Sequence, residues 1–506
     1  HGASEHASPF PTGMKTRHTA HVALNVLGTL LPMLAGVMVV PGLLRMLGAE
    51  RFGILALAWV LVGYFGLLDL GLGRALTQFL AQKEAENMPR PLQATVARSA
   101  RKAMGWIGVG WCFLILVGTP LIAPFLQLSP ALQAELGNAS LLLALAVPFL
   151  MWSTCSTGVL EARSRFTAVN AVRIPSGVAS FVVPWAIAHY SVALLHLLAG
   201  LLVARILSAL VLAWISRDEF KASAPSASMP TLEAAQGLRP LLHFGGWLTV
   251  SNIVGPMLTY FDRLAIAALV TMVSVTHYTI PFDVLSRLPA IPVAAFGVLF
   301  PLLSAAQKTD AASAHSLNHL VLTANRLLVA CWLPGMVLVA LAGHWILGWW
   351  VGPDIALAST GVWQWLAIGV AINGFAHVPY NLLQSAGKTD TIAKIHLAEL
   401  LPYALFLWWT LLHWGMLGAA IAWTLRVACD ITLLVACAIR QFPTCRRPML
   451  HTLSWAACGG LLLLGIASMT STPPASAHPW PAQVSVALPL AVLWCGYHLR
   501  LFLQHR

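Results

Sequence analysis

The sequence predicts an all-α integral membrane protein with about fourteen transmembrane helices. Of its 506 residues, 58% are hydrophobic and only 9% are charged, and the mean hydropathy is +0.78. Soluble domains carry roughly 25% charged residues, so a soluble fold is excluded. The second observation is a series of apolar runs that reach the length of about 20 residues needed to cross a bilayer. The third is the uneven distribution of Lys and Arg between those runs.

The apolar runs divide the chain into predicted spans at 22–47, 52–80, 103–126, 139–160, 166–189, 191–215, 241–270, 274–303, 327–350, 361–383, 392–414, 416–439, 453–469 and 484–501. A Ser-, Pro- and Ala-rich polar stretch after the sixth span is typical of a linker between two halves. We therefore expect a cytoplasmic tail (1–21), an N-lobe (22–216), a cytoplasmic linker (217–240), a C-lobe (241–440) and two additional helices (441–506).

The charge pattern indicates an orientation. With both termini in the cytoplasm, the inside loops and the tails hold most of the Lys and Arg that lie outside the spans, whereas the outside loops hold little beyond Arg45 and Arg51. Cytoplasmic loops of membrane proteins are enriched in these residues, so the pattern predicts an N-in, C-in topology. The same enrichment accounts for the net charge of +12 without nucleic acid as a partner.

Several sequence motifs of enzymes and metal sites are absent or incomplete in this chain. The 8 cysteines form no C-x-x-C pair, which argues against a zinc site or a disulfide framework. His315 and His319 lie four residues apart, but Ser316 stands where a metalloprotease needs a glutamate. No Walker sequence is present in the chain, so ATP is not expected to be the direct energy source. We expect no metal and no catalytic residues.

Charged side chains nevertheless remain in or near the predicted spans, although a charge at the bilayer centre costs at least about 2.5–3.5 kcal/mol. The arginines are Arg74, Arg173, Arg205, Arg263, Arg287 and Arg426. The carboxylates are Asp69, Asp262, Asp283, Glu399 and Asp430. Two couples, Asp283 with Arg287 and Arg426 with Asp430, are four residues apart and share a helix face. They are either structural ion pairs or part of a water-filled, net-positive cavity that attracts an anion.

Three segments carry a family resemblance. The segment "LLRMLGAERFGILALAWVLVGYFGLLDLGLGRALTQFLA" (43–81) resembles the second span of bacterial polysaccharide flippases, the O-antigen and capsule translocators of the multidrug/oligosaccharidyl-lipid/polysaccharide exporter superfamily. The segments 241–270 and 278–304 resemble the seventh and eighth spans of that family. The resemblance implies two pseudo-symmetric six-helix lobes plus two C-terminal helices in the bacterial inner membrane. It also implies a transporter that carries undecaprenyl-pyrophosphate-linked sugar repeat units from the cytoplasmic to the periplasmic leaflet by alternating access.

The resemblance and the charges together suggest site residues. We expect pyrophosphate and sugar to bind at Arg74, Arg173, Arg205, Arg287, Arg426, Asn25 and Asn252. The acidic residues Asp69, Asp262, Asp283, Glu399 and Asp430 would be ion-coupling or structural. No cofactor is expected apart from a coupling H⁺ or Na⁺. The expected partners are the lipid-linked oligosaccharide, membrane lipids and other glycan assembly proteins.

Three alternatives stay open. A lipid II flippase would have the same fold and carry a different sugar lipid. A drug/cation antiporter of the same superfamily would be expected to hold more acidic than basic cavity charge, which the arginine excess disfavours. A membrane glycosyltransferase or polymerase usually has a sizeable outside loop, and the largest one predicted here, 471–482, is short.

Overall fold

The structure, a computed structural model, describes residues 12–65, 72–126, 128–221, 254–255, 257–305, 311–470 and 489. Within these residues every regular element is a helix, and nine helical segments are long and apolar enough to cross a membrane. The predicted all-α membrane fold is confirmed. The predicted number of fourteen spans stays a prediction, because several of them lie partly or wholly outside the described residues. Contacts divide the chain into unit 1 (1–124 and 129–253) and unit 2 (125–128 and 254–506).

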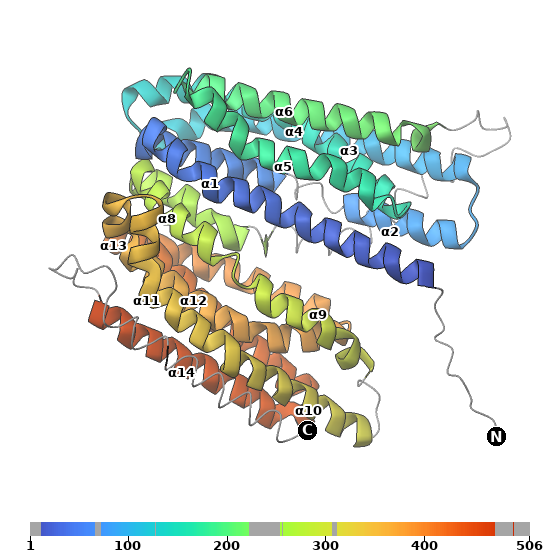
Figure 1. Ribbon diagram of the computed structural model, residues 1–506, viewed down its shortest axis with the longest axis vertical. Helices are drawn as coiled ribbons and strands as arrows, with labels where there is room; N and C mark the ends of the chain where they lie inside the picture. The colour runs from blue at the N-terminus through green and yellow to red at the C-terminus, as the bar shows by residue number, and fades with distance from the viewer. Residues whose placement is uncertain are drawn as a thin grey trace. The chain divides into compact units, whose positions relative to one another are not determined.

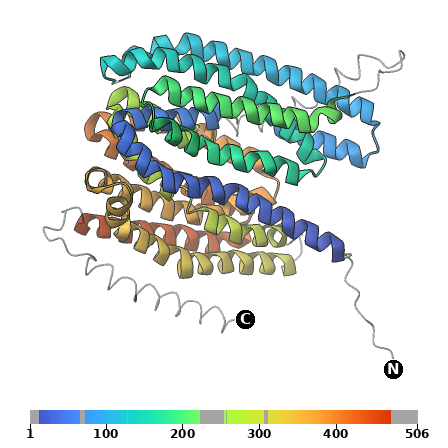
Figure 2. The same ribbon diagram turned by 45° about the horizontal axis from the view of Figure 1, so that its top comes forward.

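Unit 1 is a bundle in which α5 lies between α1 and α6, and α4 packs against both α3 and α6 (Figure 1). The blue-to-green helices of this bundle can be followed from a second side in Figure 2. A short 3₁₀ helix, Arg217–Phe220, follows α6 and packs on α3. The helices are α1 (Thr12–Phe65), α2 (Leu72–Ala85), α3 (Arg90–Ile122), α4 (Pro130–Ala162), α5 (Phe166–Ala188) and α6 (Leu194–Ser216).

Helix α1 contains the first predicted span and the start of the second, joined at a kink. Gly48 lies at the kink with φ 71° and ψ 167°. Glycine adopts a positive φ without a steric penalty, whereas a side chain there would be strained. The boundary predicted between residues 47 and 52 is therefore present as a change of helix direction. The second span was predicted to continue to residue 80, and α2 supplies its last part after residues outside the description.

The interior of unit 1 at the α2 end is made by apolar side chains of α2, α3 and α4. Leu76, Met104 and Met151 are fully buried there, and Phe220 of the 3₁₀ helix joins the same cluster. Burying such a side chain contributes about 1.5–3 kcal/mol. This packing places α2 and the 3₁₀ helix after α6 in one apolar cluster.

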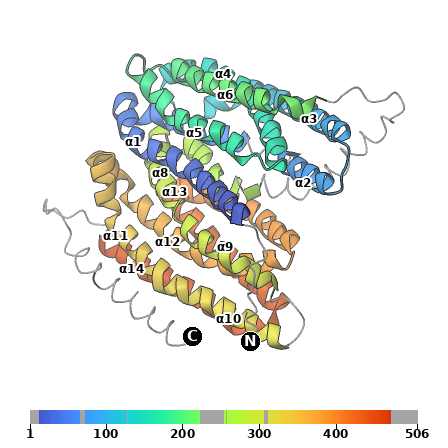
Figure 3. The same ribbon diagram turned by 45° about the vertical axis from the view of Figure 1, so that its right-hand side comes forward.

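Unit 2 is arranged around α12, which packs against α8, α9, α11, α13 and α14 (Figure 3). Trp363 of α12 is buried, and its indole N–H donates to the Val339 carbonyl of α11 at 2.9 Å. The helices are α8 (Met272–Leu285), α9 (Ala290–Ala305), α10 (Ala311–Leu327), a π-helical turn (Leu328–Trp332), α11 (Leu333–Trp350), α12 (Pro353–Ser385), α13 (Thr389–Gln441) and α14 (Arg446–Thr470).

The eighth predicted span is not one continuous helix. Residues 286–289 form a turn between α8 and α9. Pro289 has no N–H to continue the helical ladder and disfavours the helical conformation at Leu288. The amides of Ser286, Arg287 and Leu288 instead close short turns onto the end of α8. The prediction of a single helix over 274–303 was therefore wrong, and Arg287 lies in the break.

Helix α13 joins two predicted spans, 392–414 and 416–439. Gly415 separates them with φ 55° and ψ −139°, a conformation open essentially to glycine alone. Three residues later, a Cβ on Gly418 would lie 2.1 Å from the backbone oxygen of Thr410. The two halves of α13 therefore meet closely at this corner, and only glycine allows the approach.

Candidate functional site

Unit 1 contains a polar seam, which we define as Asn170, Arg173, Ser176 and Ser180 of α5 with Arg205 of α6. Residues 173, 176 and 180 follow helical spacing and so lie on one face of α5. The guanidinium of Arg205 donates to the Ser180 hydroxyl at 3.0 Å and to the Ser176 hydroxyl at 3.5 Å. These partners are neutral, so the half-buried guanidinium keeps a net charge in the bundle.

The positive charge of the seam continues toward α2. Arg173 donates to the side-chain oxygen of Asn170 at 2.5 Å, and Asn170 is 1% exposed. Arg74 and Arg173 both interact electrostatically with the carboxylate of Glu161 at the end of α4. A Cβ on Gly28 of α1 would lie 3.4 Å from the Arg173 guanidinium, so this helix approaches the seam closely. Among the described residues, the charges of Arg74 and Arg173 are thereby coupled to the carboxylate at the end of α4.

Glu161 was missed at the level of sequence. It lies two residues before Arg163 and four before Arg165, and these arginines are predicted to lie in a cytoplasmic loop. Its role becomes visible only when α2 and α5 are packed beside the end of α4. The available signal was a lone carboxylate directly after the predicted span 139–160, next to the last residue of α4.

Unit 2 holds a different kind of network, centred on Arg263. Arg263 and its neighbour Asp262 are 1% and 0% exposed, in the helical stretch 257–269. The guanidinium of Arg263 donates to Asp283 of α8 at 2.6 Å. It also lies over the rings of Tyr260 and Phe282, at 5.1 and 4.8 Å from their centroids. Arg263 is thus held by charge, hydrogen bond and aromatic contact at once.

Asp262 has separate partners. Its carboxylate accepts a hydrogen bond from the Tyr278 hydroxyl of α8 and another from the backbone N–H of Arg263, the latter at 2.7 Å. Buried carboxylates need such donors, because burial without them costs several kcal/mol. Asp262 is therefore accounted for as a structural carboxylate that fastens the 257–269 helix to α8.

A second group of ionisable residues lies on the two halves of α13. Arg426 contacts Glu399 at 3.5 Å, and His396 contacts Asp430 at 3.5 Å. Glu399 and Asp430 are each 7% exposed. Within the described part of the chain, both Glu399 oxygens and the Tyr403 hydroxyl are buried without a hydrogen bond. This group, Glu399 with Tyr403, Arg426 and Asp430, therefore has unused donors and acceptors, unlike the network around Arg263.

The structure assigns other partners to the two couples that share helical spacing. Asp283 contacts Arg263 rather than Arg287, because the break at 286–289 takes Arg287 out of the helix and leaves it exposed. Arg426 contacts Glu399, and Asp430 contacts His396, because the kink in α13 folds its first half against its second. The interpretation of Asp283–Arg287 and Arg426–Asp430 as pairs was wrong.

Of the remaining sequence-based candidates, three have side chains outside the description and one, Arg74, is described. Asn25 lies in α1, and its side chain is outside the description. Asp69 and Asn252 lie outside the described residues. Their proposed contacts with substrate or ion stay predictions. Arg74 is exposed on α2, near Glu161 as described above.

The two units therefore differ in charge. The described part of unit 1 brings Arg74, Arg173 and Arg205 together with one carboxylate. In unit 2 the buried Arg263 and the partly buried Arg426 are associated with four carboxylates, which belong to Asp262, Asp283, Glu399 and Asp430. An anion is favoured by the first arrangement, and a cation or proton by the second.

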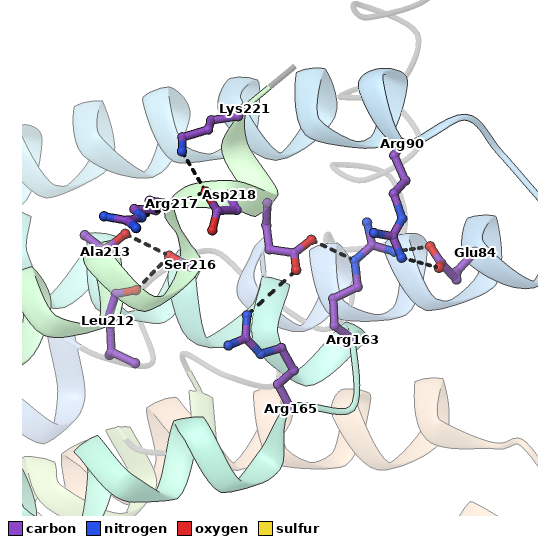
Figure 4. A network of polar contacts seen from close by, with 11 residues as sticks. Glu84, Arg90, Arg163, Arg165, Leu212, Ala213, Ser216, Arg217, Asp218 and Lys221 are labelled. Carbon is purple, nitrogen blue, oxygen red and sulfur yellow. Dashed lines mark hydrogen bonds and ion pairs between the residues drawn. The ribbon is translucent and has the colours of Figure 1, made fainter. Parts of the chain in front are cut away.

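One end of unit 1 is closed by an ionic network, shown in Figure 4. Arg163, in the turn between α4 and α5, contacts Glu84 of α2 and, at 3.1 Å, Glu219 of the 3₁₀ helix. Arg90 and Arg165 add weaker contacts to the same two carboxylates, at 3.8 and 4.0 Å. Because Arg163 is 11% exposed, it joins three segments at a partly desolvated point.

The network makes a pH prediction. A hydrogen bond from Gln93, with further help from Arg163, holds the pKa of Glu84 below its usual value. A depressed pKa means that Glu84 stabilises the fold above about pH 4.3, and that this contribution is lost as pH falls through the folded-state pKa. We expect Glu84→Gln to lower the free energy of unfolding by about 0.5–1 kcal/mol at pH 7. Thermal melting in detergent measures the effect. The melting temperature of the variant should lie below that of wild type by a constant amount from pH 5 to 8, and this gap should become smaller below pH 4. A gap in melting temperature that stays the same down to pH 3 would contradict the proposed contribution of ionised Glu84.

Comparison with known proteins identifies the family. Residues 19–307 match the family described as polysaccharide biosynthesis protein. A putative O-antigen transporter of Shigella flexneri is 31% identical over 410 residues, which cover 81% of this chain and 95% of that protein. The chain belongs to the polysaccharide biosynthesis protein family. With nine candidate spans in its described residues, this family member is a multi-span membrane protein.

Two solved structures have a fold similar to that of this family member. An inward-facing multidrug resistance MATE transporter of the MOP superfamily matches with a TM-score of 0.64 and 12% identity, over 88% of this chain and 99% of that one. The lipid II flippase MurJ, in an inward closed conformation, matches with a TM-score of 0.59 and 14% identity, over 95% and 99%. These two likenesses agree with the predicted fold of a multi-span helical membrane protein.

Proposed function

We propose that this protein is a flippase for undecaprenyl-pyrophosphate-linked oligosaccharides, which it carries from the cytoplasmic to the periplasmic leaflet by alternating access. The observation that supports this most is the polar seam of unit 1, where the half-buried guanidinium of Arg205 donates to serine hydroxyls rather than to a carboxylate of the described residues. The O-antigen transporter named above agrees in substrate class. The distribution of Lys and Arg supports placement in the bacterial inner membrane with both termini in the cytoplasm.

The chemistry of the seam fits a pyrophosphate. A guanidinium presents a planar fork of donors that can bond two phosphate oxygens at once. Arg205 donates to serine hydroxyls rather than to a carboxylate, so phosphate oxygens can replace those partners without breaking an ion pair. Arg173 and Arg74 extend the positive field toward Glu161. In this proposal Arg205 and Arg173 hold the pyrophosphate, and Arg74 attracts it.

The acidic group on α13 supports ion coupling. Glu399 is buried with no hydrogen bond to either oxygen among the described residues, and Asp430 contacts a histidine rather than a fixed cation. A proton or Na⁺ at such a group would neutralise charge inside the membrane, where neutralisation is strongly favourable. We propose that H⁺ or Na⁺ binds here during the cycle. We also propose other glycan assembly proteins as partners, because the proposed function is one step in building a surface glycan.

Export measured in a strain that lacks the chromosomal gene tests the seam. We expect Arg205→Ala to reduce surface glycan at least about ten-fold at equal membrane abundance, because bonds from a charged group contribute about 1.5–3 kcal/mol each. Arg205→Lys should retain part of the activity, since it keeps the charge and loses the fork. Lipid-linked sugar should accumulate on the cytoplasmic side.

The matched control is Arg98→Ala. Arg98 also donates to a hydroxyl, that of Thr95 at 3.2 Å, but it lies on α3 outside the seam. Normal export by Arg205→Ala, or equal losses in both variants, would refute the role of the seam.

A drug/cation antiporter is the second candidate, because unit 2 carries an excess of buried carboxylates. A lipid II flippase is a variant of the same proposal with another sugar lipid. Drug resistance in an efflux-deficient strain would support the antiporter, and complementation of a strain depleted of its lipid II flippase would support the variant. Restoration of surface glycan alone supports the function proposed here.

A further inference from the structure

A groove of about 460 Å³ lies on unit 1, outside the polar seam. It is lined by residues of α3, α4 and α6, which lie near one another in Figures 1 and 3. We define the α3 groove by Arg101, Lys102, Gly105 and Trp106 of α3, Trp152 of α4 and Ala213 of α6. Its helix α3 is the least buried of the candidate spans, with only 6% of its apolar window inside the structure.

The groove has one cationic end. The Arg101 guanidinium lies 4.2 Å from the ring centroid of Phe220, which holds it in place without neutralising it. Lys102 is exposed, and no carboxylate among the described residues forms an ion pair with either cation. The following residues, 103–122, contain no charged side chain. The two cations therefore lie at the point where α3 enters its apolar segment.

The rest of the groove is aromatic and apolar. Trp106, about one turn beyond the cations, is 76% exposed, and Trp152 is 44% exposed. Tryptophans with exposed rings are typical of the level where lipid headgroups meet acyl chains. The groove therefore presents a positive end, then indole rings, then an open apolar surface. This order matches a lipid molecule read from its headgroup to its chains.

We propose that the α3 groove binds an anionic phospholipid, with its phosphate on Arg101 and Lys102 and one acyl chain against Trp106 and Trp152. Basic pockets between transmembrane helices are known to hold anionic headgroups, and each cation near the surface contributes about a five-fold gain in affinity. Charge complementarity selects an anionic over a zwitterionic lipid. Under the proposed orientation, this is a lipid of the cytoplasmic leaflet. The site is separate from the seam and goes beyond the proposed transport function.

Substitution of one glycine in the groove, Gly105, should block it specifically. A Cβ on Gly105 would lie 3.1 Å from the indole nitrogen of Trp152, so a larger side chain fills the space between α3 and α4. Gly110 lies on the same exposed helix, and nothing is within 4 Å of its Cβ position. Gly105→Leu is therefore a plug, and Gly110→Leu is its matched control with the same change in helix composition.

The test is native mass spectrometry of the purified full chain in detergent, titrated with phosphatidylglycerol and separately with phosphatidylcholine. We expect tighter binding of phosphatidylglycerol by wild type and by Gly110→Leu. Lys102→Ala should bind about five-fold more weakly, and Arg101→Ala with Lys102→Ala about thirty-fold more weakly. Gly105→Leu should also lose binding at least about ten-fold. Melting temperatures check folding, and Lys102→Ala, a change at an exposed side chain, keeps the test valid if the double variant is unstable.

Other outcomes would overturn the proposal. Equal binding of the two lipids, or equal binding by Gly105→Leu and Gly110→Leu, would show that the groove is not a selective lipid site. Displacement of phosphatidylglycerol by equimolar undecaprenyl phosphate would assign the groove to the isoprenoid of a substrate. Displacement by millimolar inorganic phosphate would show a simple anion site. The experiment measures the amount of bound phospholipid and not the export of glycan. Its result therefore tests the lipid site independently of the flippase proposal.

Discussion

Arg263→Met is expected to lower the free energy of unfolding by about 3–5 kcal/mol, the loss typical of leaving a buried charge without the opposite charge that compensates it. Arg263 is 1% exposed, donates to Asp283 and lies beside Asp262. Its removal leaves the fully buried carboxylate of Asp262 without a neighbouring cation. The methionine keeps much of the aliphatic volume, so packing changes little. The expected result is a large drop in folded protein recovered from membranes.

Fluorescence-detected size exclusion in detergent, with thermal melting of any folded fraction, measures this effect. Arg287→Met is the matched control, since Arg287 is exposed in the break between α8 and α9. The triple change of Arg263→Met with Asp262→Asn and Asp283→Asn should recover part of the loss, because no unpaired charge then remains. Equal stability of Arg263→Met and Arg287→Met would mean that the network is not structural.

Glu399→Gln is expected to reduce export at least about ten-fold. Most of this reduction should come from the loss of H⁺ or Na⁺ binding at residue 399. The change keeps the shape of the side chain and removes a charge that is 7% exposed and has no hydrogen bond among the described residues. It also leaves Arg426 without its carboxylate partner, which costs stability. Export must therefore be compared at equal membrane abundance.

A double variant separates the two roles of Glu399. Glu399→Gln with Arg426→Gln removes both charges, so stability should recover while transport driven by an imposed proton or Na⁺ gradient in proteoliposomes stays low. The matched control is Asp390→Asn on the same helix, since Asp390 is exposed and contacts Lys394 at 2.9 Å. If the double variant transports as well as wild type, Glu399 serves only to neutralise Arg426, and the coupling proposal is refuted.

The arginines illustrate what sequence could predict of the site. Their presence in apolar runs marked Arg205 and Arg426 as residues with a partner or a function, because an isolated charge in a bilayer is too costly. The identity of the partners was not predictable from spacing. Serines on α5 hold Arg205, and Glu399, 27 positions before Arg426 in sequence, is its partner. Such contacts depend on how helices bend and pack, which a local pattern does not contain.

Arg287 shows the same limit from the opposite direction. Helical spacing favoured its pairing with Asp283, four residues earlier. Pro289 was visible in the sequence, but proline is frequent in membrane helices and its presence alone does not decide between a kink and a break. The packed structure has a turn at 286–289, and Asp283 contacts Arg263 on another helix.

By itself the sequence determined that this chain is a multi-span helical membrane protein and that it resembles polysaccharide flippases. Both follow from local quantities: apolar runs must satisfy their backbone hydrogen bonds within a helix, and loops must keep their charges in water. Only the tertiary structure decided which buried charges are matched. Ion pairing depends on side-chain atoms approaching within about 4 Å, and residues as distant in sequence as Glu399 and Arg426 reach that distance only because α13 bends. The contrast between a cationic seam in unit 1 and an acidic group in unit 2 therefore arises from packing rather than composition.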